Sequence, residues 1–457
     1  MSHQDSKVRF NAVCLKRALH WLFANISWST IKFRDDCSWT PRLLASAGMF
    51  WAWADESTLV ERFESVRKII AFLYPQQQQL AQSYQAFIKL LRRWTPQLAA
   101  MIQAALRQRM QQCLPDCWEI SGWIMFCVDG SRLELPRTRS LEEAYSPTRS
   151  SKRRCKKKRR RKKKRSQQHA KKANSPQMWI TTMWHAGTGL PWDWRTGPAD
   201  SSERAHLLEM LPALPSGALV TGDAGFVGYE YARAIIDSGR ELLVRVGANV
   251  RLLRKLGYVR ESDGTVYLWP DQQAKKHQPP LVLRLLVVQG GRHPVYLLTS
   301  VRSKSRMSDA QAAKLYRHRW GVEVFYRHLK QTFGRRKLRS ACADNVPVEI
   351  EWSLIGLWAM ALYALVEANQ CDTPPDRLSI AGVLRAFRRM MRDYRHPSQR
   401  GQRLRDRLRG AVIDSYERQN KSSRNYPRKK QESPPGAPKL MNASKHQIRQ
   451  AKQHCLR

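Results

Sequence analysis

Acidic residues are scarce in this chain of 457 residues, which has 37 Asp and Glu against 81 Lys and Arg and a formal net charge of +44 at pH 7. Self-repulsion on this scale is tolerated mainly when the usual partner is a polyanion, so the composition favours nucleic acid as the partner. Long apolar runs are also missing. The longest, residues 354–366, has 13 residues, against the roughly 18 that a membrane-spanning helix needs.

The first residues lack the order of a signal peptide, in which basic, apolar and small residues follow one another. We therefore expect no membrane association and a cytoplasmic, nucleoid-associated protein. Cysteine pairs of the kind that hold zinc are absent too: the nine cysteines are scattered, and none forms a C-x-x-C motif. Cys113 and Cys117 stand four apart without a second pair nearby, so we expect reduced thiols.

The positive charge is spread over the chain and is not confined to tails. Residues 152–165 are basic at every position except Cys155 and carry +13, and residues 421–457 carry +9, so half of the +44 lies on the remainder. With 42% apolar residues that remainder has enough material for packed domains. A basic folded body indicates a surface that follows phosphates, whereas a basic tail alone is more often a solvated arm.

The pattern of apolar residues changes along the chain and predicts an α/β fold with added helical parts. Apolar residues spaced three and four apart before residue 120 indicate amphipathic helices, and short apolar runs between turn residues after it indicate strands of a sheet. We divide the chain into a helical N-terminal domain expected to bind DNA (1–120), the first part of an α/β core (121–249, with a disordered basic excursion at 151–176), a β-rich insertion (250–300), the second part of the core (301–345), C-terminal helices (346–420) and a disordered basic tail (421–457).

Two aspartates follow apolar runs that read as strands of this core. Asp129 follows residues 123–128 and precedes Gly130, and Asp223 follows residues 218–222 and precedes Ala224. Carboxylates at the C-terminal ends of two strands of one sheet can converge on a shared cation. Each aspartate taken alone is also an ordinary turn residue.

A helix predicted from Asp309 to Phe333 carries a third acid. Ser308 is its expected N-cap and Gly334 ends it. At about 100° per residue, four polar side chains of this helix fall within roughly 60° of one another, at the border of an apolar face. The polar residues are Tyr316, Arg319, Glu323 and Lys330, and the apolar face consists of Leu315, Val322, Phe325, Leu329 and Phe333.

An ordinary salt-bridged helix would explain the Arg319 and Glu323 pair alone, but not the two strand-end aspartates upstream. The spacing Tyr316-x-x-Arg319-x-x-x-Glu323-x-x-x-x-x-x-Lys330 resembles the Y-R-E-K signature of the DDE transposases of the insertion sequence 4 type. Asp129-Gly130 and Asp223-Ala224-Gly225-Phe226 are similar to the two aspartate motifs of that family. The resemblance covers about residues 122–370, and the basic run at 152–165 has no counterpart in it.

The resemblance implies a ribonuclease H-like catalytic core in which Asp129, Asp223 and Glu323 bind two Mg²⁺ ions, which Mn²⁺ can replace. It also implies that Tyr316, Arg319 and Lys330 contact the DNA backbone beside the cut, and that a homodimer assembles the synaptic complex. Carboxylate oxygens are the ligands that Mg²⁺ prefers, and a pair of such ions can activate the attacking oxygen and stabilise the leaving one. The expected function is a transposase that cuts transposon ends in double-stranded DNA and joins the 3′-OH to target DNA.

Three other functions remain open from the sequence. A metal-dependent endonuclease would hydrolyse DNA without joining it, and a catalytically inactive relative would only bind DNA. An RNA-binding protein that used the Lys and Arg tract would not need the folded body for binding. Joining of a pre-cleaved transposon end separates a transposase from the first two.

Replacing residues 152–165 by a Gly/Ser linker of equal length should reduce the salt dependence of DNA binding, because each neutralised phosphate contributes about 0.9 to the slope of log K against log salt. The slope is measured by titrating a DNA duplex at several salt concentrations. End cleavage should survive the replacement. Loss of all cleavage would contradict the prediction and assign the run to catalysis.

Overall fold

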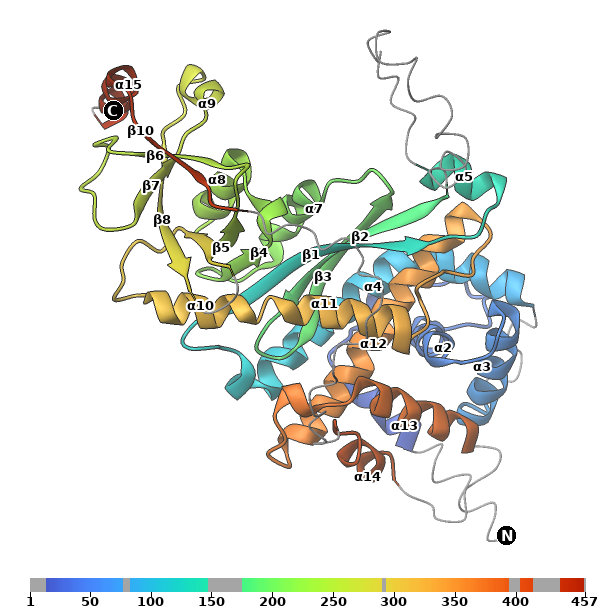
Figure 1. The fold of residues 1–457 in the computed structure, drawn as a ribbon. Helices are drawn as coiled ribbons and strands as arrows, with labels where there is room; N and C mark the ends of the chain where they lie inside the picture. The colour runs from blue at the N-terminus through green and yellow to red at the C-terminus, as the bar shows by residue number, and fades with distance from the viewer. Residues whose placement is uncertain are drawn as a thin grey trace, which may run out of the picture.

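The structure, a computed structural model, describes residues 14–76, 83–146, 175–289, 293–393, 403–413 and 436–455. Within these ranges the strands form one ten-stranded sheet, in the order β10-β6-β7-β8-β9-β5-β4-β1-β2-β3 (Figure 1). The basic run at 152–165 lies outside the described residues, as does the predicted excursion at 151–176 except for its last two residues. The strands are β1 (Met125–Glu134), β2 (Gln177–His185), β3 (Leu190–Pro198), β4 (Leu219–Gly222), β5 (Glu241–Val246), β6 (Arg251–Arg254), β7 (Thr265–Leu268), β8 (Leu281–Val288), β9 (Val295–Thr299) and β10 (Lys439–Asn442).

The five strands β3-β2-β1-β4-β5 form the core of the fold. β2 runs antiparallel to both β1 and β3, while β4 runs parallel to β1 and β5 parallel to β4. This mixed sheet with helices on both faces is the α/β, ribonuclease H-like core expected from the sequence. Its first strand is longer than the predicted run 123–128, because β1 continues to Glu134 as a two-stranded ribbon with β2.

The β-rich insertion continues this same sheet. β9 pairs antiparallel with β5, and β8, β7 and β6 follow outward in antiparallel pairs. The predicted tail at 421–457 is wrong for residues 436–455, which form β10 and the helix α15 (Lys445–Cys455). β10 lies parallel to β6 and pairs Lys439 with Arg251, so backbone hydrogen bonds to a sheet edge order a stretch too polar to fold alone.

Helices from both ends of the chain pack together at one end of the sheet. The central helix α12 is buried along most of its length and contacts α2, α4, α13 and α14 (Figure 1). Its composition and length would suit a membrane span, but 89% of the apolar window lies inside the protein, as in a core helix. The helices of this unit are α2 (Pro41–Trp53), α3 (Leu59–Leu73), α4 (Tyr84–Cys113), α12 (Val346–Asn369), α13 (Ile380–Asp393) and α14 (Leu404–Arg409).

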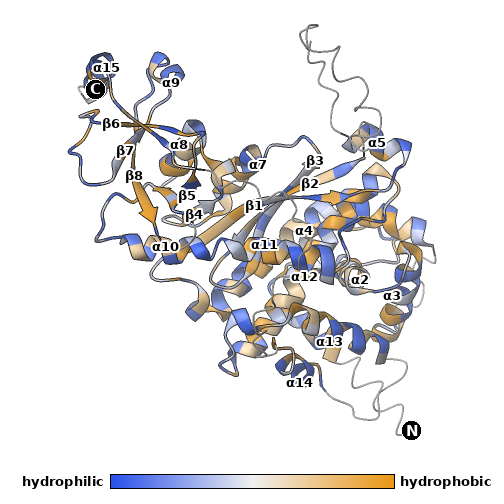
Figure 2. Ribbon diagram, in the orientation of Figure 1, coloured by the Kyte–Doolittle hydropathy of each residue, from blue (hydrophilic) through white to orange (hydrophobic). Residues whose placement is uncertain are grey.

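Local sequence signals explain where several of these helices begin and which side they bury. Thr58 and Glu61 form a capping box at the start of α3, and Ser83 caps α4 through the backbone N–H of Ala86. Figure 2 shows α13 with apolar and polar residues on opposite sides, and its apolar residues Phe387 and Met390 are buried.

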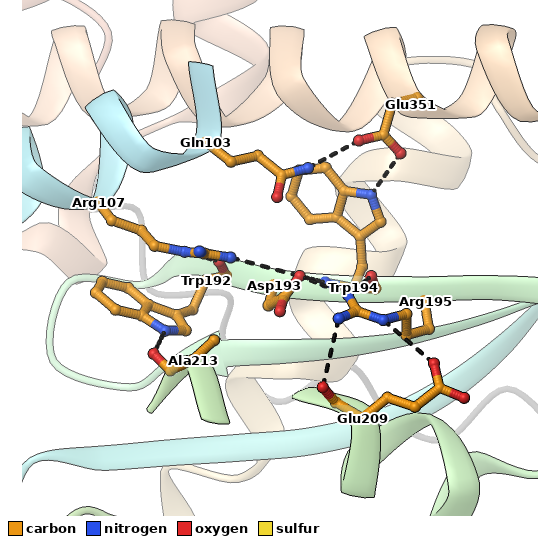
Figure 3. Close-up of polar contacts among 9 residues, drawn as sticks. All are labelled: Gln103, Arg107, Trp192, Asp193, Trp194, Arg195, Glu209, Ala213 and Glu351. Carbon is orange, nitrogen blue, oxygen red and sulfur yellow. Dashed lines mark hydrogen bonds and ion pairs between the residues drawn. The ribbon is translucent and has the colours of Figure 1, made fainter. Parts of the chain in front are cut away.

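A polar network joins this helical unit to β3 (Figure 3). The Glu351 carboxylate of α12 accepts hydrogen bonds from Trp194 Nε1 and Gln103 Nε2, both at 2.8 Å. Arg107 of α4 donates to the carbonyl oxygen of Trp192 at 2.9 Å. Burial raises the pKa of Glu351 to about 7. These contacts fix α4 and α12 against β3, the edge strand of the sheet.

The remaining helices flank the sheet. α7 and α8 contact each other, and α7 also contacts β1, β2 and β3, whereas α10 contacts β5 and β8 and α11 contacts β1. Figure 1 shows α10 and α11 crossing the opposite face of the sheet from α7 and α8. These helices are α5 (Arg139–Tyr145), α7 (Glu203–Met210), α8 (Tyr229–Asp237), α9 (Asp271–Lys275), α10 (Asp309–Arg317) and α11 (Trp320–Arg327).

Replacing Trp352 by Ala should destabilise the fold by about 3–5 kcal/mol, the usual cost of emptying a buried Trp site. Trp352 is fully buried, donates to Thr95 Oγ1 at 2.9 Å, and lies so close to Gly48 of α2 that a Cβ there would be 2.5 Å from the ring. Urea unfolding followed by circular dichroism measures the change. Trp320→Ala is the control, because this Trp is 61% exposed and its loss should cost less than about 0.5 kcal/mol.

Candidate active site at the carboxyl edge of the sheet

Asp129 and Asp223 occupy matching positions, Asp129 on β1 and Asp223 directly after the adjacent parallel strand β4. β1 and β4 pair Cys127 with Thr221, and each aspartate stands two residues further along the chain. Side chains two residues apart on a strand point to the same face, and neighbouring strands lie about 4.8 Å apart. The two carboxyl groups therefore leave the sheet side by side.

The two aspartates differ in their backbone setting. The expectation that Asp129 ends its strand is wrong: it lies inside β1 opposite Thr182, at the point where the neighbouring strand β4 stops. Asp223 does follow β4, where its Oδ1 accepts a hydrogen bond from the backbone N–H of Gly225 at 2.7 Å. Asp129 thus lies on the part of β1 that extends beyond its pairing with the shorter strand β4.

The helix that carries the third acid is not continuous, as the sequence had suggested. It divides into α10, α11 and a π-helical turn, η6 (His328–Thr332), and the amides of His318 and Arg319 bond three residues back in the tighter 3₁₀ manner. At the junction a Cβ on Gly321 would lie 2.0 Å from Trp184 of β2. The indole thus packs directly on the helix backbone close to the point where the α-helical hydrogen bonding is interrupted.

The predicted polar stripe survives this division. Arg319 and Glu323 form an ion pair at 2.6 Å, and the guanidinium of Arg319 also lies over the ring of Tyr316 at 5.9 Å. Lys330 Nζ donates to Ser131 Oγ of β1 at 2.7 Å. All four stripe residues are half-buried, whereas the five predicted apolar residues, Leu315, Val322, Phe325, Leu329 and Phe333, are buried.

A hydrogen bond from Tyr326, a residue that the sequence analysis did not single out, links α11 to the backbone of Asp129. Tyr326 is buried, and its hydroxyl donates to the carbonyl oxygen of Asp129 at 2.8 Å. Because Tyr326 is three residues from Glu323, this contact and the one from Lys330 to Ser131 bring the acid of α11 to the edge that carries Asp129. In the sequence, the only signal for this contact is that Tyr326 lies near the apolar face of the predicted helix.

The three acids lie within electrostatic reach of one another. Burial, together with the charges of Asp223 and Glu323, raises the pKa of Asp129 to about 6, although the backbone N–H of Gly130 and the charge of Arg319 act in the opposite direction. Burial alone would lower the pKa of Arg319, but Tyr316 and Glu323 raise it. A concentration of like charge of this kind stabilises a bound cation.

The donor set suits a hard divalent cation in its chemistry, since it consists of carboxylate oxygens that repel one another. Within the described ranges, no three His, Cys, Asp or Glu side chains are grouped closely enough to hold a metal ion. In this arrangement the Glu323 carboxylate pairs with the guanidinium of Arg319 in place of a metal ion.

A fourth acid, Glu203, lies beside this centre and was missed by the sequence analysis. Burial, together with the charges of Asp129 and Asp223, raises its pKa to about 7. Its position after the N-cap Ser202 signals a helix start, but nothing in the sequence connects it to either aspartate.

Comparisons with known proteins show the family of the chain. The sequence model of the family described as Transposase DDE domain matches residues 124–358, just over half of the chain. The protein belongs to this transposase DDE domain family. Membership implies dependence on divalent metal.

One relative is the transposase InsG of the insertion sequence element IS4 from Escherichia coli K12, which is 29% identical over 181 residues. The match spans 37% of this chain and 40% of that relative, so it covers well under half of InsG. A piggyBac transposase synaptic complex with hairpin DNA is similar at a TM-score of 0.40 and 14% identity, over 92% of this chain and 87% of that one.

Replacing Asp129 by Asn should stabilise the metal-free protein at pH 7.5 but not at pH 4. The pKa of Asp129 is raised from 3.8 to about 6 by folding, so the folded state retains a proton that the unfolded state loses between those values. Stability is therefore lost as pH rises through this window, and the Asn variant avoids that loss. The measurement is the melting temperature in EDTA at both pH values.

The exposed Asp36, whose side chain is 74% accessible, gives the matched control Asp36→Asn, which should change little at either pH. If the melting temperatures of Asp129→Asn and the unmodified protein differ by the same amount at pH 4 and at pH 7.5, ionisation of Asp129 is not the cause of the effect.

Proposed function

We propose that this protein is the transposase of an insertion sequence, which cuts transposon ends and joins the released 3′-OH to target DNA. The observation that carries the proposal is that Asp129 of β1 stands in register with Asp223 and is influenced electrostatically by Asp223 and by Glu323 of α11, in a chain of the DDE domain family. The net charge of +44 supports double-stranded DNA as the partner.

In this proposal Asp129, Asp223 and Glu323 hold two Mg²⁺ ions, or Mn²⁺ in their place. When bound, such a pair of ions activates the attacking oxygen and stabilises the leaving oxygen of a phosphodiester. Glu323 must release Arg319 to join the two aspartates. The freed guanidinium is then available to a DNA phosphate close to the cut, because Arg319 stays on the same turn of the helix.

The cations of the stripe hold the DNA backbone in the proposed reaction. Lys330 donates from η6 beside Asp129, and Tyr316 stands half-buried at the other end of the stripe. Burial raises the pKa of Tyr316 to about 12, so the phenol remains a neutral hydrogen-bond donor at physiological pH. These three side chains can contact phosphates without adding negative charge.

Two successive displacements at phosphorus use this one centre. Water attacks the phosphodiester at the transposon end, the P–O3′ bond breaks, and the 3′ oxygen leaves as a hydroxyl. That 3′-OH then attacks a target phosphodiester and displaces another 3′-OH. We further propose a homodimer in the synaptic complex and a location in the cytoplasm on the nucleoid.

Replacing Asp129, Asp223 or Glu323 by Ala should reduce Mg²⁺-dependent end cleavage by roughly 10³-fold or more, because residues that act as a unit fail together. Cleavage is measured on DNA that carries the ends of the element. Asp36→Ala is the control for the loss of an exposed acid. Retained Mg²⁺-dependent cleavage by any of the three variants refutes the assignment.

The same preparation tests joining with a pre-cleaved end. Strand transfer to target DNA supports a transposase, whereas cleavage without joining would reduce the function to that of an endonuclease. Arg319→Ala and Lys330→Ala should weaken end binding while metal binding persists.

A further inference from the structure

Glu203 reaches the catalytic edge from the opposite face of the sheet. Successive side chains of a strand alternate between faces, so Asp129 points toward α11 and the position of Gly130 faces α7. The carboxyl group of Glu203 lies against Gly130: a Cβ there would be 2.2 Å from its Oε1 and 2.6 Å from its Cδ. The absence of a side chain at residue 130 therefore admits this acid.

Within the described part of the chain, the Glu203 carboxyl group has no cation of its own. Among the described residues we find no hydrogen bond or ion pair for it, although Arg132 and Arg204 act on it electrostatically. Both cations are engaged elsewhere, Arg132 over the ring of Trp179 at 4.8 Å and Arg204 at the backbone. Glu323, by contrast, is already neutralised by Arg319.

Arg204, the next residue, holds the loop of the second aspartate. Its Nε donates to the carbonyl oxygen of Gly225 at 2.8 Å, and the N–H of the same Gly225 donates to Asp223 Oδ1 at 2.7 Å. The first turn of α7 thus contacts both aspartate motifs, through Glu203 at Gly130 and through Arg204 at Gly225.

A role in starting α7 does not explain this placement. Ser202 already caps the helix through the N–H of Ala205, and an acid in the first turn interacts with the helix dipole equally well when it is fully solvated. Half-burial beside two aspartates instead adds repulsion and the cost of removing a charge from water.

We propose that Glu203 is a fourth carboxylate of the cation-binding centre, admitted by Gly130 and carried by the turn of α7 that Arg204 links to the loop of Asp223. The inference rests on the proposed function, because it assigns Glu203 to the same cation site. A neighbouring carboxylate strengthens the attraction of the site for a divalent cation even without direct ligation, and loss of such a group typically weakens metal affinity 10–100-fold.

The test is Mn²⁺ binding by the full chain, measured by electron paramagnetic resonance in the absence of DNA. Glu203→Gln keeps the size of the side chain and removes its charge, so Mn²⁺ affinity should fall about 10–100-fold. Glu209→Gln is the matched control on the same helix, since Glu209 is exposed and paired with Arg195 away from the aspartates. It should bind Mn²⁺ like the unmodified protein.

Gly130→Ala provides a second variant that leaves Glu203 itself intact. The added Cβ must displace the Glu203 carboxyl group, so Mn²⁺ affinity should fall to a similar degree, and the double variant with Glu203→Gln should show no further loss. An additive loss would overturn the role given to Gly130.

The outcomes separate the two levels of the proposal. Mn²⁺ affinity within twofold of normal for Glu203→Gln overturns the inference if Asp223→Asn still loses binding, and it leaves the proposed function standing. Binding that is unaffected by both Glu203→Gln and Asp223→Asn overturns the proposed cation site as well. A loss confined to Asp223→Asn, Glu203→Gln and Gly130→Ala supports both.

Discussion

The close approach of α11 to β1 is the contact on which the rest of the site depends. Trp184 packs on the backbone at Gly321, and Tyr326 donates to the carbonyl oxygen of Asp129. A single hydrogen bond contributes only about 1 kcal/mol net, so most of the stabilisation comes from the apolar face of α10 and α11, where Leu315 and Val322 are fully buried. That packing offsets the repulsion among acids gathered at the sheet edge.

The balance of charge at this edge follows from the same geometry. A strongly basic protein places Asp129, Asp223 and Glu203 together, and it pairs only Glu323 with a cation of its own. The arrangement leaves net negative charge at one place on a positive body. In the proposed function that place attracts divalent cations, while the surrounding Lys and Arg residues attract DNA.

The sequence predicted the parts of the fold that rest on periodicity and on local signals. The polar stripe of Tyr316, Arg319, Glu323 and Lys330 lies half-buried beside an apolar face, as its spacing indicated. The strand before Asp223 also ends as expected. The extension of β1 past Asp129 was not predicted, because it depends on pairing with β2, which is about 50 residues away in the chain.

Long-range contacts account for the other differences. Residues 439–442 are too polar to indicate a strand, and they become one because β6 offers a free sheet edge. The helix at 309–333 is interrupted where the backbone meets Trp184. Glu203 resembles any acid in the first turn of a helix until Gly130 is seen opposite it.

By itself the sequence determined the basic character, the three widely separated acids and the stripe that surrounds the third, because charge and helical spacing are local properties. Only the tertiary structure decided that Asp129 and Asp223 stand in register. It also decided that Tyr326 of α11 bonds to the backbone of Asp129, and that the side chain of Glu203 lies against Gly130. These features depend on strand pairing and on contact between opposite faces of a sheet, which no local pattern encodes.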